Sequence, residues 1–312
     1  MNYLRITLLF TLLFSITFAN PINIYSYQKN IQDAKKALTN KNQKLNIKLI
    51  YKGNVKNAQT LLLEINEKNI SDVKLTFKDL NLPFYKNELK KDYFYALVPI
   101  SYYQKIGNYK VIISYLKNNK REFTSAEIRI TDGKYKSEKV KVQGSKVNLN
   151  KSDKTRTQNE YKEAMQIYRT KTKEMLWSDD FMMPMNSRVT SAFGTKRVYN
   201  NQLKSFHSGI DFKAKIGTKI VASNDGIVRL AKNRFYAGNS VIIDHGQGIF
   251  TCYYHLSKIV VKKNQRIKKG ELLGLSGDTG RITGPHLHFA TRVNGYLVEP
   301  KNLIGLLNSL NN

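Results

Sequence analysis

Alternation of hydrophobic and polar residues predicts that the first half of the chain is built from β-strands. Side chains of a strand point to opposite faces in turn, and aromatic and β-branched residues favour the same structure. The runs of this kind are Leu45–Tyr51, Asp72–Phe77, Tyr93–Ile100, Tyr109–Tyr115 and Ala126–Ile130. Turn-forming pairs stand between them, such as Gly53-Asn54, Asn118-Asn119 and Asp132-Gly133. We therefore expect residues 20–147 to form a small β-sandwich-like accessory domain, with a short helix at Gln28–Leu38.

A polar linker and a helix, together residues 148–180, should follow this domain. Residues 144–156 are polar and typical of a linker. Thr157-Gln158-Asn159-Glu160 has the capping-box pattern, in which the Thr hydroxyl and the Glu carboxylate each satisfy a free backbone N–H at a helix start. We expect one face of this helix to dock on a domain surface, and Pro184 to end any continuation. The residues of that face are Tyr161, Met165, Tyr168 and Met175.

Residues 181–312 show strand patterns nearly to the end and should form one compact antiparallel β domain. Gly217–Ala222, Asn224-Asp225-Gly226 and Ile227–Ala231 predict strand, hairpin turn and strand, because Asp-Gly tolerates the positive φ angles of tight hairpins. The other predicted strands are Asn239–Asp244 and Phe250–Leu256, joined through Gly246 and Gly248, then Leu272–Ser276, Pro285–Val293 and Tyr296–Val298. The chain is thus predicted to be mainly β, with two β domains joined by a linker helix.

The N-terminus has the features of a secretory signal peptide over residues 1–19. Met1–Arg5 supplies a positive charge, Ile6–Phe18 is a short apolar run, and Ala19 is a small residue suited to cleavage before Asn20. The apolar run is shorter than the roughly 20 residues that span a bilayer, and no later segment approaches that length. We expect a mature protein that is soluble outside the cytoplasm.

The net charge and the cysteine content limit the kinds of partner and of metal site that the protein can have. The formal net charge is +29, which points toward an acidic partner such as nucleic acid, anionic lipid or an anionic cell-wall polymer. Lysine is also abundant in loops without chemistry, so the charge by itself identifies no partner. The only cysteine is Cys252, which excludes an intrachain disulfide and a cysteine-rich zinc site. Any metal must therefore be held by nitrogen and oxygen.

The histidines are confined to one part of the chain. All five lie between positions 207 and 288, and four of them, His207, His255, His286 and His288, belong to one expected constellation. Ring nitrogens concentrated in this way serve metal binding or proton transfer. The fifth, His245, is expected to be structural. Our working hypothesis is a zinc hydrolase.

Spacing shows how such a site could be built. In a strand, His286 and His288 project to the same side with Cα atoms about 6.5–7 Å apart, so one can bind a metal while the other reaches the metal-bound water. In a straight strand His207 and Asp211 would lie about 13–14 Å apart, too far to share one ion. The chain must bend between them, and Gly209 adopts conformations closed to other residues. Two histidines and one carboxylate would make a three-ligand zinc site with the fourth position open.

Each of these motifs alone also occurs without metal, and only together do they favour a zinc or similar divalent site. Strand parity puts His255 on the face of Thr251 and Tyr253, opposite Cys252 and Tyr254. At such a position it could be an inert surface histidine. Beside the other histidines, a catalytic role is the favoured interpretation.

The sequence of residues 181–303 resembles the lysostaphin/LytM-type zinc peptidoglycan endopeptidases. The matching residues agree in order and approximate spacing, and together they are highly specific. They are Phe193-Gly194, His207-Ser-Gly-Ile-Asp211, Gly217-Thr218, Ala222, Gly226, Gly238-Asn239, Tyr254-His255-Leu256, Gly270, Gly277, Thr279-Gly280 and Gly284-Pro-His-Leu-His288. The accessory domain, the helix and Leu176-Trp177 resemble Gram-negative members more loosely.

The resemblance implies roles for five residues. His207, Asp211 and His288 would bind one Zn²⁺ per chain, and His255 and His286 would orient or deprotonate the attacking water and steady the oxyanion. It does not decide which of these two histidines is the general base. The implied activity is that of a periplasmic metallopeptidase that hydrolyses peptidoglycan, at the D-Ala–meso-diaminopimelate cross-link or, as a carboxypeptidase, at a terminal D-Ala. The implied role is cell-wall remodelling for growth, division or cell shape, with other wall-remodelling proteins as candidate partners.

Two other functions remain to be weighed. Some relatives have lost the zinc ligands and activate other wall hydrolases, but all five site residues are intact here. A basic nucleic-acid-binding protein would explain the charge, but the export signal argues against it. We also consider that the accessory domain or the helix covers part of the cleft.

Overall fold

The computed structural model describes residues 48–311, apart from 89, 143, 147, 200 and 202. The predicted signal peptide, the predicted helix Gln28–Leu38 and the beginning of the predicted strand Leu45–Tyr51 lie outside the described residues. All described residues belong to one compact unit, Leu45–Asn312. Within them, no helix combines the length and apolar character needed to cross a membrane.

Two β-sheets pack on each other in the first half of the chain. One has the order β1-β3-β7-β6 and the other β2-β9-β8-β4-β5, and all pairs are antiparallel except β2 with β9. The strands are β1 Lys48–Tyr51, β2 Asn54–Lys56, β3 Thr60–Asn66, β4 Ile70–Phe77, β5 Leu80–Pro83, β6 Tyr85–Lys86, β7 Tyr93–Pro99, β8 Gly107–Lys117 and β9 Lys120–Thr131. Leu63 of β3 packs in one core with Leu75, Ile113 and Ile128 of the other sheet. The predicted sandwich-like arrangement is confirmed.

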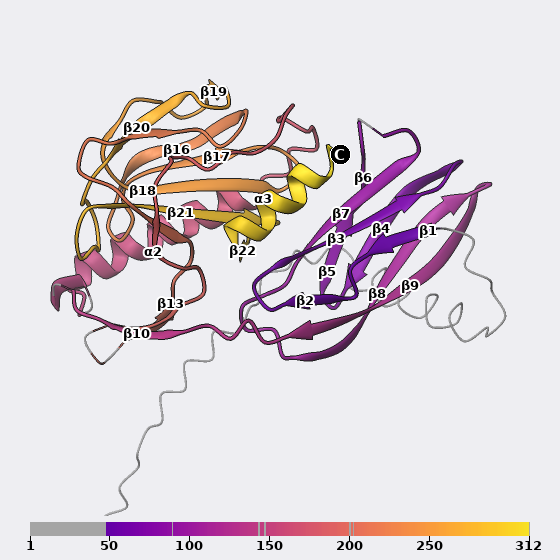
Figure 1. Cartoon of the computed structure of the whole chain (residues 1–312), viewed down its shortest axis with the longest axis horizontal. Helices are drawn as coiled ribbons and strands as arrows, with labels where there is room; N and C mark the ends of the chain where they lie inside the picture. The colour runs from indigo at the N-terminus through magenta and orange to yellow at the C-terminus, as the bar shows by residue number, and fades with distance from the viewer. Residues whose placement is uncertain are drawn as a thin grey trace, which may run out of the picture. The chain divides into compact units, whose positions relative to one another are not determined.

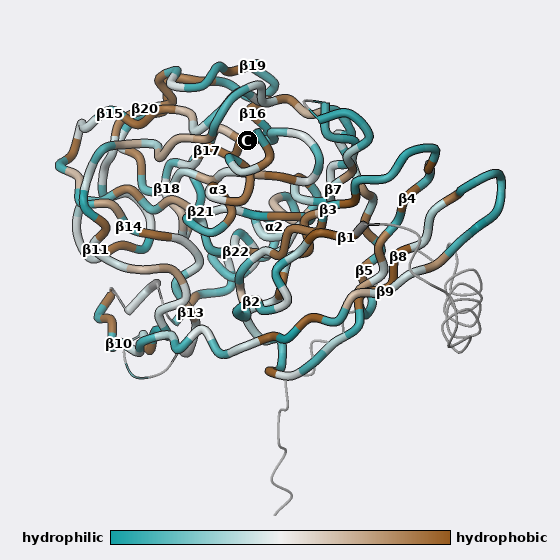
Figure 2. The backbone as a smooth tube through the Cα atoms, turned by 45° about the vertical axis from the view of Figure 1, so that its right-hand side comes forward, coloured by the Kyte–Doolittle hydropathy of each residue, from teal (hydrophilic) through white to brown (hydrophobic). Residues whose placement is uncertain are grey.

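The hairpin between β8 and β9 follows the turn signal in the sequence. Asn118 and Asn119 both have positive φ, 51° and 59°, as a tight hairpin turn requires and as asparagine tolerates. Charged and amide residues surround this turn, and the loop is hydrophilic (Figure 2).

A helix connects the two halves but begins earlier than predicted. After β10 (Ser137–Val140) and a short 3-10 helix, η1 (Gly144–Lys146), helix α2 runs over Lys151–Tyr168. Its N-cap is Asn150, whose side chain accepts the Asp153 N–H at 2.8 Å. The predicted cap at Thr157 is therefore wrong, because the Asn150–Asp153 pair starts the helix first. The Thr157 hydroxyl instead donates to the Lys154 carbonyl within the helix.

The docking face of α2 is partly as predicted. Ala164 and Tyr168 are buried, and Met165 packs against the same cluster, whereas Tyr161 is exposed. The helix ends at Tyr168, well before Pro184, so Met175 lies beyond it.

The second half contains a ten-stranded sheet and a smaller three-stranded sheet. The main path of the large sheet is β11-β14-β21-β18-β17-β16-β19, with β15, β20 and β22 attached, and every pair in it is antiparallel. Its strands are β11 Val189–Ser191, β14 Ile210–Lys213, β15 Lys219–Val221, β16 Gly226–Arg234, β17 Gly238–Asp244, β18 Ile249–Ile259, β19 Arg266–Ile267, β20 Leu272–Ser276, β21 His286–Val293 and β22 Tyr296–Val298. In the small sheet β10 pairs parallel with β12 (Lys196–Tyr199), which pairs with β13 (Leu203–Phe206). The chain then forms α3 (Pro300–Ser309), which the strand pattern did not predict.

Helices cover both faces of the large sheet (Figure 1). Along β17, Val241 and Ile243 belong to the cluster that includes Leu303 and Leu307 of α3. Ile242, which lies between them, belongs to the cluster that includes Tyr168 of α2. Because strand residues alternate between faces, α3 packs on one face of the sheet and α2 on the other.

The predicted hairpin at Asp225-Gly226 is wrong. β15 pairs with β20, and β16 pairs with β17 and β19, so the two strands flanking this turn are not partners. Neither Asp225 nor Gly226 has positive φ. The Asp225 carboxylate instead accepts from the Lys268 ammonium at 2.7 Å and from the Lys269 N–H at 2.8 Å, which ties the turn to the segment before β20.

Candidate metal centre

Asp211 and His288 lie opposite each other on neighbouring strands. β14 and β21 pair antiparallel with Asp211 in register with His288. Opposite residues have Cβ atoms about 4.5–5.5 Å apart on one face, close enough for a carboxylate and an imidazole to meet. Asp211 Oδ1 is 2.9 Å from His288 Nδ1.

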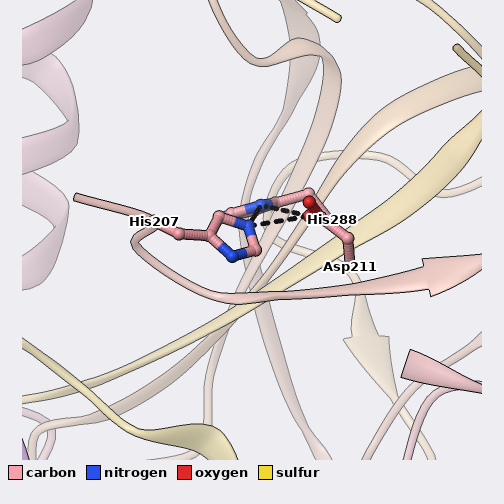
Figure 3. Close-up of side chains that lie close together, drawn as sticks. All are labelled: His207, Asp211 and His288. Carbon is pink, nitrogen blue, oxygen red and sulfur yellow. Dashed lines mark hydrogen bonds and ion pairs between the residues drawn. The ribbon is translucent and has the colours of Figure 1, made fainter. Parts of the chain in front are cut away.

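His207 reaches the same point from the segment between two strands. It follows the last residue of β13, and three residues separate it from Asp211 in β14. Its Nε2 is 2.8 Å from Asp211 Oδ1 and 3.0 Å from His288 Nδ1, so the predicted bend is present (Figure 3). One ligand atom from each of the three residues lies within 4.8 Å of the other two.

The donor atoms of this cluster fit a divalent metal ion. All three side chains are buried, and they direct two ring nitrogens and one carboxylate oxygen to one place. His207 Nδ1 lies 2.8 Å from the Ala192 carbonyl, which can only accept, so Nδ1 carries the proton and Nε2 keeps its lone pair for a metal. Three nitrogen and oxygen ligands leave a further coordination position open.

The two histidines keep the Asp211 carboxylate ionised. Burial alone would raise its pKa, but the close contacts of its Oδ1 with the His207 and His288 rings outweigh burial and hold the pKa well below the ordinary value. On the other side of the pair, the His288 ring stacks on Tyr254 with an interplanar angle of 4°. The orientation of His288 is thus fixed from two directions.

His255 joins the cluster from a face that strand parity did not predict. Its ring centroid is 5.1 Å from that of His286 and 6.0 Å from that of His288. His288 is in register with Tyr254, so these histidines share the Tyr254 face rather than the Tyr253 face. The predicted parity is wrong because the ladder between β17 and β18 shifts register here and His255 has a φ of 65°. A bulge of this kind turns a side chain to the other face.

The two outer histidines are each held by a backbone carbonyl. His255 Nδ1 lies 2.7 Å from the Thr279 carbonyl, and His286 Nδ1 lies 2.8 Å from the Gly284 carbonyl. In both rings Nδ1 must donate, which leaves Nε2 as the acceptor nitrogen. Burial, together with the neighbouring His288 and His286, lowers the pKa of His255 to about 3, so it is neutral near pH 7.

Comparison with known proteins identifies this part of the chain. Residues 205–300 match peptidase family M23. This range includes the three residues of the cluster, His207, Asp211 and His288, and the two histidines beside it, His255 and His286. The chain carries a peptidase family M23 domain. The match does not include residues 1–204.

Curated relatives resemble about a third of the chain. The peptidoglycan DD-endopeptidase ShyA of Vibrio cholerae is 47% identical over 109 residues, which is 35% of this chain and 25% of the relative. The DD-carboxypeptidase/endopeptidase Mpg of Neisseria meningitidis serogroup B is 39% identical over 114 residues, 36% of this chain and 26% of the relative. The chain therefore spans about a quarter of the length of these relatives.

A solved structure extends the likeness beyond the M23 domain. A crystal structure from Pseudomonas aeruginosa, assigned to peptidase M23, has a TM-score of 0.62 and 25% sequence identity. It covers 80% of this chain and 94% of its own. The fold of the first half is therefore shared in large part with that protein.

Arg197 supports the cluster of His207, Asp211 and His288, although no sequence motif includes it. Its Nη2 lies 3.1 Å from Asp211 Oδ2 and 2.9 Å from Ser191 Oγ, and its Nε lies 2.6 Å from Glu138 Oε1. Asp211 thus turns one oxygen to the histidines and the other to Arg197. In a chain with 52 lysines and arginines, no sequence signal distinguishes this one.

Tyr102, from the first half of the chain, packs against the segment that carries His207. The Tyr102 ring stacks on Phe206, the residue before His207, with centroids 3.9 Å apart. The Tyr102 hydroxyl donates to the Gly194 carbonyl, and the Gly194 N–H donates to the His207 carbonyl. The described residues that line the cavity beside the cluster all lie at or after Arg197, which gives no support to the hypothesis of a covered cleft.

Gly209 is required for space rather than for an unusual backbone angle. Its φ is outside the positive region, contrary to the expectation, but a Cβ there would lie 2.3 Å from the Phe289 carbonyl oxygen and 2.7 Å from His288 Nε2. Both distances are too short for real atoms, and one neighbour is backbone. Glycine lets the chain pass directly over β21.

We therefore expect Gly209→Ala to displace His288 and weaken metal binding. Overpacking should also lower the free energy of unfolding by about 1–3 kcal/mol. The metal content after dialysis measures the first effect. Unfolding in urea measures the second. Gly305→Ala in α3, where a Cβ meets nothing within 4 Å, is the control and should leave both unchanged or slightly improved. Equal behaviour of the two variants would contradict the steric role.

His245 is placed away from the cluster, in a buried structural setting. Its Nδ1 lies 2.6 Å from the Asp225 carbonyl and its Nε2 lies 2.7 Å from Thr251 Oγ1. Burial lowers the pKa of His245 to about 4 from the ordinary value of 6.5. The folded protein therefore holds this ring neutral at pH values where the unfolded chain protonates it.

This difference predicts a loss of stability in acid. The contribution of the neutral His245 ring to the free energy of unfolding is complete above pH 6.5. It decreases as the pH falls toward 4, by up to about 3 kcal/mol. Urea unfolding of the wild type and of His245→Gln at pH 7 and pH 4.5 tests it. The difference in unfolding free energy between the two should be smaller at pH 4.5, and a constant difference would refute the prediction.

Proposed function

We propose that the protein is a zinc-dependent peptidoglycan hydrolase of the periplasm. The observation that carries the proposal is the convergence of His207, Asp211 and His288, with His255 and His286 beside them, inside the segment that matches peptidase family M23. Relatives of this segment are named as peptidoglycan DD-endopeptidases and as a DD-carboxypeptidase/endopeptidase. Their names support peptidoglycan as the substrate.

Zinc, one ion per chain, is the metal that the donor set favours. His207 Nε2, Asp211 Oδ1 and His288 Nδ1 would hold it, and imidazole and carboxylate ligands in a three-ligand site are typical of catalytic zinc. When bound, the ion polarises the scissile carbonyl and lowers the pKa of water at the site toward about 7.

The chain itself supplies proton transfer and orientation. The Nδ1 protons of His255 and His286 are engaged by the Thr279 and Gly284 carbonyls, so the Nε2 atoms are the groups that accept or return a proton. Once protonated, either ring can donate a hydrogen bond to the oxyanion or a proton to the leaving amine. Arg197 holds the second oxygen of Asp211, so the first stays directed at the metal.

The bond that we propose is the D-Ala–meso-diaminopimelate cross-link, with removal of a terminal D-Ala at the same site. The residues before the M23 segment would form an accessory domain at 20–147 and a linker at 148–180, after cleavage of a signal peptide at residue 19. The net charge of +29 would favour approach to an anionic wall. The role would be wall remodelling that sets cell shape, alongside other wall-remodelling proteins.

The test is digestion of cross-linked muropeptide dimers by the purified mature protein, with products identified by mass. We expect monomers from a D,D-cut, no reaction after removal of metal by a chelator, and recovery on addition of Zn²⁺. Intact dimers after incubation with zinc-loaded protein would contradict the proposal. That outcome would favour the alternative, a regulator of other hydrolases.

A further inference from the structure

One arginine in the wall of the cleft has no acidic partner within the part of the chain that the structure describes. Arg281 lines the same cavity of about 230 Å³ as His207, His255 and His288. Among the residues that the structure describes, no carboxylate oxygen lies within 4.0 Å of its guanidinium, and the guanidinium makes no hydrogen bond. Arg197, in the same wall, is by contrast paired with both Glu138 and Asp211.

Two tyrosine rings hold the Arg281 guanidinium. Its central carbon lies 4.3 Å from the Tyr199 ring centroid and 4.4 Å from the Tyr236 ring centroid. A planar guanidinium that rests on aromatic faces keeps the N–H groups at its edge free. That edge matches a carboxylate, which can accept two parallel hydrogen bonds from it.

The backbone around Arg281 is also tied to the histidines. The Arg281 N–H donates to the Tyr236 carbonyl at 2.8 Å. Gly280 has a φ of 89° and passes so close to Gly238 that a Cβ would lie 2.4 Å from the Gly238 nitrogen. Thr279, two residues before Arg281, holds His255 through its carbonyl. The position of the guanidinium relative to His255 is therefore fixed by a short, packed segment.

We propose that Arg281 is the carboxylate-binding residue of the cleft, and that the preferred substrates carry a free carboxylate next to the amide that is cleaved. This inference rests on the proposed function, because it places a peptide in the same cleft. In the proposed cross-link, the carbon that bears the leaving nitrogen also bears a carboxylate, which is the group that Arg281 would bind. Bridges that lack a carboxylate at this position would be poor substrates.

The test compares two ligands that differ only in this group. A muropeptide ending in meso-diaminopimelate with both carboxylates free is compared with its counterpart amidated at the carboxylate beside the free amine. Calorimetry on the zinc-loaded full chain measures their Kd values, and the matching cross-linked dimers give kcat and KM. The wild type should bind the free form about 10- to 100-fold more tightly than the amidated form.

Arg281→Met should remove this preference, with little change for the amidated ligand. Arg281→Lys should restore only part of it, because lysine lacks the planar fork. The control Arg266→Met removes an exposed arginine of β19 and should keep the full preference. Metal content should be equal in all variants.

The outcomes separate this inference from the proposed function. Equal binding of both ligands by the wild type would overturn the role of Arg281 whether or not the dimers are cleaved. A preference that persists in Arg281→Met, or an equal loss for both ligands, would also overturn it. An Arg281-dependent preference without cleavage would uphold the carboxylate site and reject the hydrolase.

Discussion

Replacing Asp211 with alanine is expected to remove both the bound metal and the hydrolytic activity. The carboxylate supplies one of three ligands, and its oxygens also lie 2.8 Å from His207 Nε2, 2.9 Å from His288 Nδ1 and 3.1 Å from Arg197 Nη2. Without it two imidazoles remain, and they bind divalent ions far more weakly. We expect metal affinity to fall by more than about 100-fold and kcat/KM by at least about 1,000-fold.

Metal analysis after gel filtration and turnover of cross-linked muropeptides measure these two effects. Asp79→Ala, at an exposed aspartate between β4 and β5, is the control and should keep both properties. Circular dichroism of Asp211→Ala should show an intact fold. A variant that retains the metal and unchanged turnover would exclude Asp211 as a ligand and the cluster as the catalytic site.

Replacing His255 with asparagine is expected to slow the reaction without releasing the metal. His255 lies beside the three-residue cluster but is not part of it, and its Nε2 is the acceptor nitrogen. Asparagine is chosen because it tolerates the positive φ of 65° at this position. Loss of a general acid–base group should lower kcat by about 100- to 10,000-fold.

Two measurements decide this second expectation. Zinc content should equal that of the wild type, and steady-state kinetics should show the loss in kcat. His245→Gln serves as the histidine control, because that ring is buried away from the cluster, and its kcat at pH 7 should stay near the wild-type value. An unchanged kcat in His255→Asn, or parallel loss of zinc, would assign His255 a different role.

Hydrophobic patterning predicted the strands well where it was regular. β4, β7, β8 and β9 overlap the predicted runs, and the pair β17–β18 is joined through Gly246 and Gly248 as expected. β3 was missed because three leucines in succession, Leu61–Leu63, interrupt the alternation in Thr60–Asn66. Alternation of apolar and polar residues detects a half-buried strand only where it is regular.

Partners of strands were harder to predict than strands. The Asp225-Gly226 signal suggested a local hairpin, yet β15 pairs with β20, which lies more than fifty residues further along the chain. A tight-turn pair of residues is compatible with several backbones, and here the Lys268 and Lys269 contacts to Asp225 select another one. Which strands pair over such a distance depends on how all strands of the sheet are arranged, because β20 also pairs with β18.

The sequence predicted which side chains come together, but not all of their geometry. The spacing of His207 and Asp211 required a bend, and the structure has it. The face of His255 was predicted incorrectly, because a single-residue register shift is not visible in a periodic pattern. Arg197 and Arg281 were missed because their partners, Asp211 in one case and two tyrosine rings in the other, come from distant segments.

The docking of α2 has a consequence for oxidation. Cys252 is the only thiol of the chain and is fully buried in the cluster that Ala164 and Tyr168 of α2 complete, with its Sγ 3.4 Å from the Tyr168 hydroxyl. A thiol reacts with oxidants or with another chain only when it can be reached as a thiolate. The helix that connects the two halves thus also keeps a single cysteine from pairing between molecules in an oxidising environment.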